Sequence, residues 1–387
     1  MLVNQIYTIM NNVTKEVTGQ TGLVNEDLSN IVDVGVAVFG ASSVDNYVKA
    51  LVDHIGRVIF VNRPYSGGAP SVLMDGWEYG AVCEKIQSEI PEAVENESWE
   101  LTDGQSYDPN VFYKPVVSAK FFSKKVTFEI DRSFTELQVR GSFSSATQLN
   151  AFLSMLYNDI DKAMNINIDG LIMRTINNMI AQTMWDSLNS GGTLTITGKT
   201  STRAVNLLYQ YNQAFGTSLT VDKCLTTPEF IRYAINQILI YKKRMRKASK
   251  LFNGGGKIRF TPDDMSRMVI LSDLKTAADV YLQSDTYHDE YTMLPQADDV
   301  PYWQGSGTDY SLNSISAINV NTAQGKAVSV SGVLGALFDR DALGVANLDR
   351  RVTTHYNPKA EFYTNFYKFD AGYFNDFDEN FVVFYVA

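Results

Sequence analysis

The chain has 387 residues, of which 45% are hydrophobic and 12% aromatic, so it is long enough for two or three domains with apolar cores. Its formal net charge of −10 argues against strong general affinity for nucleic acid, because phosphate binding depends on clustered cations. Two cysteines exclude a disulfide framework, and three histidines, none paired at metal-ligand spacing, give no recognisable zinc site.

The N-terminal part predicts an extended arm followed by a helix and a strand. Residues 1–43 contain short apolar pieces separated by glycines, and we expect one or two short helices there. Residues 44–55 carry apolar side chains at helical spacing, Gly56 can end that helix, and residues 57–62 favour a strand. The start lacks a basic leader with an apolar core, and no apolar run approaches ~20 residues, so we expect neither a secretory signal nor a membrane span.

Residues 64–110 form a long stretch rich in Gly, Pro and acidic residues between two β-prone segments. Within residues 84–108, eight acidic side chains accompany a single base, Lys85. A two-stranded acidic arm of this length cannot bury enough apolar area to order itself, so we expect it to need another surface. The residues that we assign to an inter-subunit contact of this arm are Trp77, Glu84, Glu89, Glu92, Glu95, Glu97, Trp99 and Glu100.

A strand and a very long helix follow the arm. Residues 116–130 alternate in part between apolar and polar side chains, which predicts a strand with one apolar face. Residues 146–189 carry the strongest helical pattern in the chain, with apolar side chains at steps of three and four. As one helix they would span roughly 66 Å at 1.5 Å per residue, which exceeds a normal globular core and predicts a spine. Gly170 is a candidate for a kink in that helix.

Two further helices share one start signal. Thr227-Pro228 and Thr261-Pro262 each offer an N-cap hydroxyl and a first-turn proline, with acidic residues directly after them. They predict helices over residues 228–249 and 262–283, the second broken near Ser272. The segment Asn253–Gly256 between them contains three consecutive glycines, and we expect it to be mobile.

The last part of the chain predicts strands. Residues 193–197, 315–320, 327–333 and 335–338 are the strand candidates. The tail over residues 356–385 has twelve aromatic side chains interleaved with Asn and Asp, which predicts a strand-rich, half-buried end. Packing in the core or between subunits explains these aromatic side chains better than base stacking, because the surrounding charge is acidic.

Residues 242–250 (KKRMRKASK) hold six bases and no acid. The bases are Lys242, Lys243, Arg244, Arg246, Lys247 and Lys250. Cations are favoured near a helix C-terminus by the macrodipole, so the simplest interpretation is a helix end. The same patch could dock the acidic arm of a neighbour or face the phosphates of DNA, and the sequence leaves these alternatives open.

The sequence gives no strong sign of catalysis, a cofactor or a metal. Neither a nucleotide-binding glycine pattern nor a G-x-S-x-G motif occurs. Cys83 and Cys224 are better explained as structural thiols than as nucleophiles. The acidic residues within 285–299 fit a solvated loop better than a divalent-ion site, because their spacing matches no calcium loop. We therefore expect no catalytic, cofactor-binding or metal-binding residues.

Three stretches occur in an informative order. They are YVKALVDHIGRVIFVN (47–62), TFEIDRSFTELQVRGSFSSATQLNAFLSMLYNDIDKAMNINID (127–169) and GALFDRDALGVANLDRRVTTHYNPKAEFYTNFYKFDAGYFNDFDENFVVFYV (335–386). Together they resemble the major capsid proteins of tailed bacteriophages, with the Hong Kong 97-type fold. The likeness is greatest to the capsid proteins of podoviruses of the phi-twenty-nine type, without the immunoglobulin-like C-terminal domain of that group.

The resemblance implies an α+β fold with five parts. These are an N-terminal arm and entry helix (1–58), an extended E-loop (59–128), a P-domain with the spine helix (129–190), an A-domain (191–344), and C-terminal strands that return to the P-domain (345–387). It implies a structural rather than an enzymatic role.

The resemblance also implies partners and a location. Such a chain assembles with itself into hexamers and pentamers of an icosahedral phage head that encloses double-stranded DNA non-specifically, with a portal and a separate scaffolding protein and without a membrane. Assembly would take place in the cytoplasm of the bacterial host, and the product would be the capsid of the virion. The alternatives are an encapsulin-like compartment shell, a cytoplasmic hydrolase with a cysteine or carboxylate site, and a DNA-binding protein that uses residues 242–250.

Overall fold

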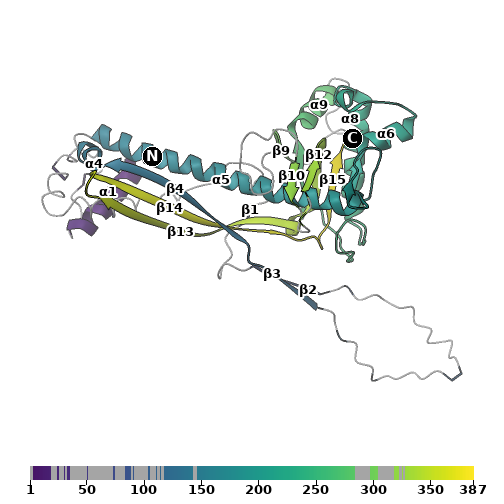
Figure 1. Cartoon of the computed structure of the whole chain (residues 1–387), viewed down its shortest axis with the longest axis horizontal. Coiled ribbons are helices and arrows are strands. Elements are labelled where there is room, and N and C mark those ends of the chain that lie inside the picture. Colours follow the sequence, from purple (N-terminus) through teal and green to yellow (C-terminus); the bar gives the residue numbers. More distant parts are fainter. Residues whose placement is uncertain are drawn as a thin grey trace. The chain divides into compact units, whose positions relative to one another are not determined.

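A computed structural model of the whole chain shows a mixture of helices and strands (Figure 1). The described residues are 3–18, 24–25, 30, 33–34, 50, 73–74, 83–88, 90, 103–104, 110, 114, 117–142, 146–283, 297–303, 318–321, 325 and 327–387. The chain divides into two compact units. Unit 1 comprises residues 1–76, 125–173 and 345–372, and unit 2 comprises residues 77–124, 174–344 and 373–387.

Unit 1 contains a four-stranded sheet in the order β1-β13-β14-β4. Its strands are β1 (Leu73–Met74), β13 (Leu343–Asn357), β14 (Phe362–Asn375) and β4 (Lys125–Thr135), and the ends of β13 and β14 continue into unit 2. β14 pairs antiparallel with β4, and β1 runs parallel to β13. Two helices, α1 (Val3–Thr18) and α4 (Glu136–Ser142), belong to the same unit.

Polar side chains fix the register of three of these strands. Asp370 of β14 lies directly opposite Thr127 of β4, whose hydroxyl donates to its carboxylate at 2.6 Å. Arg351 of β13 approaches the same carboxylate with two nitrogens, each 3.1 Å from an oxygen. Burial would raise the pKa of Asp370, but Thr127 and Arg351 outweigh burial and hold that pKa below its ordinary value. A slip of one residue would break this bidentate contact, so the pairing is specified by charge as well as by alternation.

The predicted spine is α5 (Ala146–Leu188), a single helix of 43 residues. It runs through Gly170 without an interruption, so the glycine does not end the helix. Its C-terminal part is buried almost all round, including Ile172, Ile176 and Ile180. A helix that is buried on nearly all sides is a core element, although here Thr175 and Asn177 are among the buried side chains.

Unit 2 contains a five-stranded sheet in the order β7-β15-β12-β8-β9. The strands are β7 (Ala204–Asn206), β15 (Phe381–Tyr385), β12 (Val333–Asp339), β8 (Ser266–Leu271) and β9 (Asp298–Val300). Every residue of β12 and β15 is buried, so both faces of the central sheet are covered. The last strand of the chain thus lies between β7 and β12, whereas the sequence assigned residues 345–387 as a whole to the P-domain.

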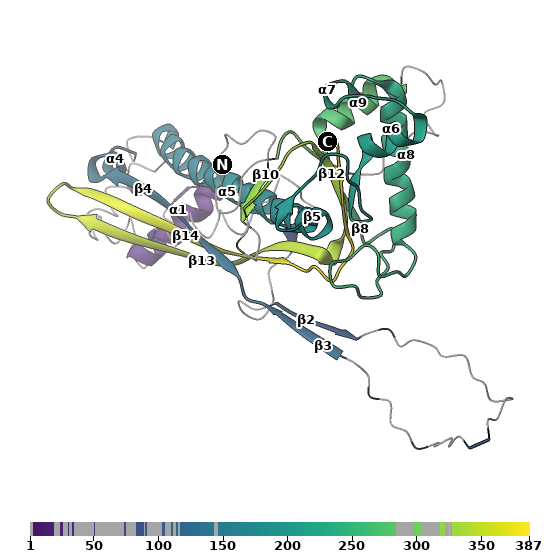
Figure 2. The same ribbon diagram turned by 45° about the vertical axis from the view of Figure 1, so that its right-hand side comes forward.

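Helices α6 (Leu207–Phe215) and α8 (Pro228–Met245) cover one face of this sheet (Figure 2). Their buried side chains pack against alternate residues of the strands, such as Met268 and Ile270 of β8. On its other side, α8 packs against α9 (Ser272–Gln283). The short helix α7 (Val221–Cys224) precedes α8. Unit 2 also contains two small antiparallel strand pairs. They are β5 (Asn189–Ser190) with β6 (Thr193–Leu194), and β10 (Ile318–Asn321) with β11 (Ala327–Val330). None of the described helices has both the length and the apolar character that a membrane crossing needs.

One predicted helix is wrong over its first half. Residues 262–271 form a turn and then strand β8, and the helix begins only at Ser272. The run of apolar residues in β8 pairs with β12 on one side and β9 on the other, so tertiary pairing overrides the proline start signal. The other predicted start holds, because α8 begins at Pro228. The Thr227 hydroxyl, however, donates to the carbonyl of Lys223 and does not cap the helix.

Candidate functional site

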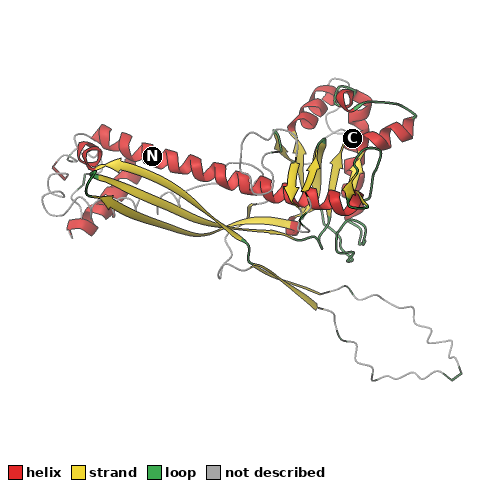
Figure 3. Ribbon diagram, in the orientation of Figure 1, coloured by secondary structure: helices red, strands yellow, loops and turns green. Residues whose placement is uncertain are grey.

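Strands β2 (Cys83–Ser88) and β3 (Val117–Phe122) form a two-stranded antiparallel ribbon in unit 2, drawn as a pair of arrows in Figure 3. We call these two strands the β2–β3 ribbon. Lys85 lies opposite Lys120, and Ile86 lies opposite Ala119. Because directly opposed residues share a face, the two lysines lie on one face of the ribbon and Ile86 lies on the other.

The two faces of the ribbon differ in exposure. On β3, Ser118, Lys120 and Phe122 are half-buried and alternate with exposed residues. The exposed face carries large apolar side chains: Ile86 is 66% exposed, Val117 56% and Phe121 64%. Exposed aromatic and β-branched side chains at alternate positions make this face a candidate contact surface.

The half-buried face of the ribbon meets a tight acidic turn between β14 and β15. We call Asp376–Glu379 the acidic turn. The N–H of Glu379 donates to the carbonyl of Asp376 at 3.4 Å, and the N–H of Asp378 donates to the Asp376 carboxylate at 3.1 Å. An aspartate that bonds the backbone two residues on is a common way to close such a turn. The turn is therefore folded by the same side chain that receives the lysines.

Asp376 lies at the centre of the contact, and its side chain is fully buried. Lys120 donates to one carboxylate oxygen at 2.5 Å, and Lys85 donates to the other at 2.9 Å. With the N–H of Asp378, three donors converge on one carboxylate. This arrangement satisfies a buried charge, which would otherwise be strongly unfavourable.

Further charges surround this carboxylate. Lys85 also reaches Glu379 at 2.9 Å, and Lys257 reaches Asp378 at 3.0 Å. Arg259 lies 3.4 Å from Glu379. Asp378 receives Lys120 as well, at 2.6 Å. We call the whole group, which is Lys85, Lys120, Lys257, Arg259, Asp376, Asp378 and Glu379, the ion cluster.

The ion cluster shifts the pKa values of its members. Burial lowers the pKa of Lys85 and of Lys120, but their carboxylate partners outweigh burial and raise both values. Burial raises the pKa of Asp376 and of Asp378, but the lysines outweigh it and hold both values below the ordinary range. All four groups are therefore charged at neutral pH, and each favours the charged state of its partners.

Backbone hydrogen bonds also hold the acidic turn. The backbone N–H groups of Gly254 and Gly255 both donate to the carbonyl of Phe377, at 2.7 and 3.2 Å. A Cβ atom at Gly255 would collide with the carboxylate of Asp378. The expected mobility of this glycine segment therefore does not match its structure, in which the glycines allow close packing against the acidic turn.

Most residues that the sequence assigned to the acidic arm lie outside the described part of the chain. These are Trp77, Glu89, Glu92, Glu95, Glu97, Trp99 and Glu100. Glu84 lies in β2, opposite Phe121. Their contact with another subunit stays a prediction. The ion cluster itself was missed, although the tetrapeptide DFDE at 376–379, directly after an aromatic strand, was a visible signal.

The structure confirms that the basic run ends a helix. Lys242, Lys243 and Arg244 lie in the last turn of α8. Arg246 pairs with Asp263 at 3.1 Å, with both side chains more than half exposed, and the Arg244 guanidinium lies over the Tyr241 ring. Lys247 and Lys250 follow the helix and are exposed. We call residues 242–250 the α8 basic end.

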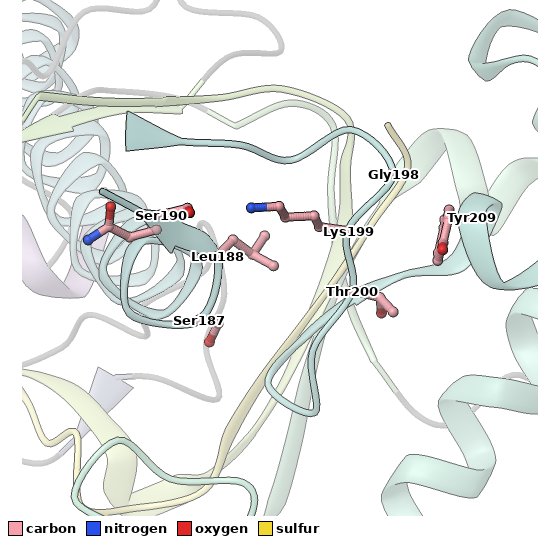
Figure 4. A pocket seen from close by; sticks show the side chains of 8 residues that line it. Ser187, Leu188, Ser190, Gly198, Lys199, Thr200 and Tyr209 are labelled. Atoms are coloured by element: carbon pink, nitrogen blue, oxygen red, sulfur yellow. The ribbon is translucent and has the colours of Figure 1, made fainter. Parts of the chain in front are cut away.

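An open pocket of about 400 Å³ lies where α5 ends (Figure 4). Its lining residues are Ser187, Leu188, Asn189, Ser190, Gly198, Lys199, Thr200 and Tyr209. In Figure 4 the side chain of Lys199 extends toward Leu188 and Ser190. The lining offers hydroxyl, amide and one ammonium group, which is the chemistry of a solvated surface rather than of a matched acid and base.

The remaining candidates for chemistry are weak. Burial raises the pKa of the Cys224 thiol to about 11, so this thiol is protonated at neutral pH and is a poor nucleophile. Within the described ranges, no group of three or more His, Cys, Asp or Glu residues could hold a metal ion. The charged centre of the described structure is the ion cluster, whose geometry attaches one element to another rather than enclosing a substrate.

The sequence model of one protein family, described as Phi29-like phage major capsid protein, matches residues 7–385. The chain belongs to this family. Comparison with curated proteins found no match. As a member of the Phi29-like phage major capsid proteins, the chain is a shell protein of a phage head and forms part of the virion capsid. The family is structural, which confirms the prediction that the chain is not an enzyme.

Solved structures from other phages resemble this Phi29-like capsid protein in fold. One is a chain from native bacteriophage P68, in a structure described as "Structure of head fiber and inner core protein gp22 of native bacteriophage P68". Its TM-score is 0.50 and its identity 8%, and the match covers 84% of this chain and 87% of that one. Others are the capsid of Staphylococcus phage Andhra (TM-score 0.49, 10% identity, 84% and 87% covered) and that of Cyanophage P-SCSP1u (0.44, 11%, 85% and 92%). Together with the family, the α+β architecture is consistent with the Hong Kong 97-type fold that the sequence predicted.

Proposed function

We propose that this capsid protein forms the hexamers and pentamers of an icosahedral head that encloses double-stranded DNA. Heterologous contacts that close with rotational symmetry give rings, which suits such capsomers. In this proposal residues 59–128 are the E-loop, residues 129–190 and 345–372 the P-domain, and residues 191–344 the A-domain. Residues 373–387 join the A-domain, because β15 pairs with β7 and β12.

The observation that carries the proposal is the two-faced β2–β3 ribbon. One face is attached to its own subunit through the ion cluster, and the other exposes Ile86, Val117 and Phe121. In the proposal this exposed face lies on a neighbouring copy, which buries the apolar side chains that a free subunit leaves in water. The acidic residues of the arm then set register and disfavour wrong docking, because exposed ion pairs contribute specificity more than affinity.

We assign the acidic arm of a neighbour to the α8 basic end. Six bases lie there, whereas residues 84–108 carry eight acids, so the charges are complementary. Leu251 and Phe260 add exposed apolar surface close to the basic end, at 57% and 51% exposure. The backbone bridge between Ser249 and Arg259 holds these two segments together. A mixed basic and apolar surface suits an acidic chain that contains Trp99 and Ile90 better than it suits a phosphate backbone, which offers charge alone.

The remaining partners follow from the role of a container. A formal charge of −10 suits enclosure of DNA without tight binding, because cations would be needed to hold phosphates. A scaffolding protein would guide closure, and a portal would occupy one vertex. Assembly would take place in the cytoplasm of the bacterial host.

Electron microscopy of expressed protein tests the proposal. Wild-type chain, produced with its scaffolding protein, should give closed particles. Replacement of residues 91–113 by a short Gly-Ser linker keeps the β2–β3 ribbon and removes most of the acidic arm. The expected product is a folded subunit, by circular dichroism, that forms no closed particles. Closed particles from this variant would show that the arm is not the assembly element, and a wild-type chain that stays monomeric with its scaffold would overturn the proposal as a whole.

A further inference from the structure

We propose that Lys85, Lys120 and Asp376 are positioning residues that fix the direction of the β2–β3 ribbon before a subunit meets its neighbours. The inference rests on the proposed function, in which the exposed face of the ribbon contacts another copy. It adds that the acidic turn, close to the C-terminus, sets how that face is presented. The ribbon then enters assembly with its direction already fixed.

The first argument is that the described hydrogen bonds, ion pairs and ring contact between the ribbon and the rest of unit 2 come from one face. Lys85 and Lys120 bind the acidic turn, and Lys85 also donates to the carbonyl of Asp341 at 3.2 Å. On β3, the ring of Phe122 lies 5.0 Å from that of Phe374. Ser118, on the same face, lies 3.4 Å from the ammonium of Lys257. A rotation of the ribbon about its own axis would break all of these contacts together.

The second argument is that an isolated two-stranded ribbon does not hold its own direction. Two strands without a third strand or a packed helix are marginal in water. The aromatic contact of Phe122 offers little area, and the large apolar side chains of the other face are more than half exposed in the described structure. The described attachment is therefore mainly electrostatic, and its geometry decides where the ribbon lies.

The third argument concerns the buried carboxylate of Asp376. It receives one lysine from each strand, on different oxygens, and the backbone N–H of Asp378. If the ribbon shifted, the carboxylate would lose two of these three donors. An unpaired buried charge is strongly unfavourable, so only one position of the ribbon satisfies the site. Attachment by apolar packing alone would tolerate many positions.

The alternative is that the ion cluster only stabilises the fold of unit 2. The two interpretations differ in what the removal of one lysine charge does. If the cluster positions the ribbon, its loss should loosen residues 83–88 and 117–122 and leave the central sheet unchanged. If it only stabilises the fold, its loss should loosen β12 and the ribbon alike.

The experiment compares Lys120→Met, which keeps most of the length of the side chain and removes its charge, with Lys120→Arg, which keeps the charge. Lys124→Met is the matched control, because Lys124 is exposed and lies two residues beyond β3. Amide hydrogen exchange of the free subunit is measured over the ribbon and over residues 333–339, and particles are counted by negative-stain microscopy. Lys85→Met is a second variant that leaves Lys120 on Asp376.

We expect Lys120→Met to raise exchange in the ribbon by at least ~10-fold, with residues 333–339 unchanged, and to give aberrant or open particles. Lys120→Arg and Lys124→Met should behave as wild type. Wild-type exchange in the ribbon of both Lys120→Met and Lys85→Met would overturn the inference. Normal particles despite raised exchange would overturn it as well. The inference would also be overturned if Lys120→Met and Lys85→Met both raised exchange in residues 333–339 as much as in the ribbon. Absence of particles from the wild-type chain would instead contradict the proposed function.

Discussion

Lys120 donates to the carboxylate of Asp376, which lies 256 residues later in the chain, at a distance of 2.5 Å. Lys85, opposite Lys120 on the ribbon, donates to the other oxygen of the same carboxylate at 2.9 Å. The acidic turn therefore binds both strands of the β2–β3 ribbon, which lies far earlier in the chain. Because a contact between residues so far apart in sequence closes a long loop, we expect the ribbon to attach late in folding.

The first prediction concerns pH. The pKa values of Asp376 and Asp378 are lowered by folding, so their contribution is present above the unfolded value of about 4 and is lost as pH falls through the folded values. The pKa values of Lys85 and Lys120 are raised, so their contribution is present below about 10.4 and is lost as pH rises through the folded values. Protection of the ribbon should thus be constant between about pH 5 and pH 9.

Hydrogen exchange, corrected for the intrinsic effect of pH on exchange chemistry, measures this protection. Lys257 also faces Asp378, while Arg259 and Lys85 face Glu379. A midpoint of ribbon release between pH 6 and pH 8 would contradict the assignment of these four groups. Release below about pH 4 would agree with it.

The second prediction concerns Gly255. An alanine Cβ there would collide with the Asp378 carboxylate, which Lys120 and Lys257 hold in place. Gly255→Ala should therefore displace Asp378 and cost about 1–3 kcal/mol, in the range of overpacked sites. Gly256→Ala is the control, because its Cβ would meet open space and only its positive φ of 65° is unfavourable. We expect about 1 kcal/mol for that backbone effect.

Chemical denaturation of the free subunit gives both values, and hydrogen exchange of residues 117–122 locates the damage. Only Gly255→Ala should loosen the ribbon. Equal exchange of the ribbon in the two variants would mean that the close approach of Gly255 to the acidic turn does not matter for its position.

The third prediction concerns the exposed face of the ribbon. Phe121→Ser and Ile86→Ser remove apolar side chains that are 64% and 66% exposed, so the free subunit should change in stability by no more than about 0.5 kcal/mol. Assembly should nevertheless fail or require a higher protein concentration. Truncation of a buried aromatic anchor at an interface commonly costs about 2 kcal/mol or more of binding free energy. Val280→Ser, at a site that is 57% exposed on α9, is the matched control.

Light scattering against protein concentration, followed by microscopy, measures the effect. Normal assembly of both ribbon variants would place the exposed face in solvent within the shell and would remove the main support for its contact with a neighbour. Failure of Val280→Ser as well would show that the assay reports general loss of apolar surface.

The fourth prediction concerns the α8 basic end. Reversal of two exposed charges, Lys243→Glu with Lys247→Glu, should weaken assembly and abolish binding of a synthetic peptide of residues 84–108. Lys199→Glu with Lys162→Glu, a pair of exposed lysines elsewhere, should leave peptide binding unchanged. Fluorescence anisotropy at low and physiological salt gives the affinity and its screening.

An opposite result has a clear meaning. If the reversed variant still binds the peptide and assembles normally but its particles retain less DNA, then the basic end faces the DNA. In that case wild-type protein should also bind duplex DNA with a steep dependence on salt.

The sequence predicted those elements whose patterns are local. The start of α8 at Pro228 and the length of α5 followed from proline and from apolar periodicity. The strand β8 was missed because its pairing with β12 and β9, over 60 residues and nearly 30 residues away, outweighs a proline start signal. Local pattern carries no information about such partners.

The candidate site shows the same limit more strongly. The acidic arm and the basic end stand out in composition, so the sequence identified them at once. The ion cluster joins residues 85, 120 and 376, and nothing near any of them in the sequence indicates the other two. The same limit applies to the segment Asn253–Gly256, because the acidic turn against which Gly254 and Gly255 pack lies over 120 residues later.

A cryo-electron microscopy map of the assembled shell tests the account most directly, at a resolution that shows side chains. The account predicts that Ile86, Val117 and Phe121 of one copy are buried against a neighbouring copy, while Lys120 still binds Asp376 within its own chain. A shell in which this face of the ribbon lies in solvent, or in which the ribbon has left its own acidic turn, would contradict it.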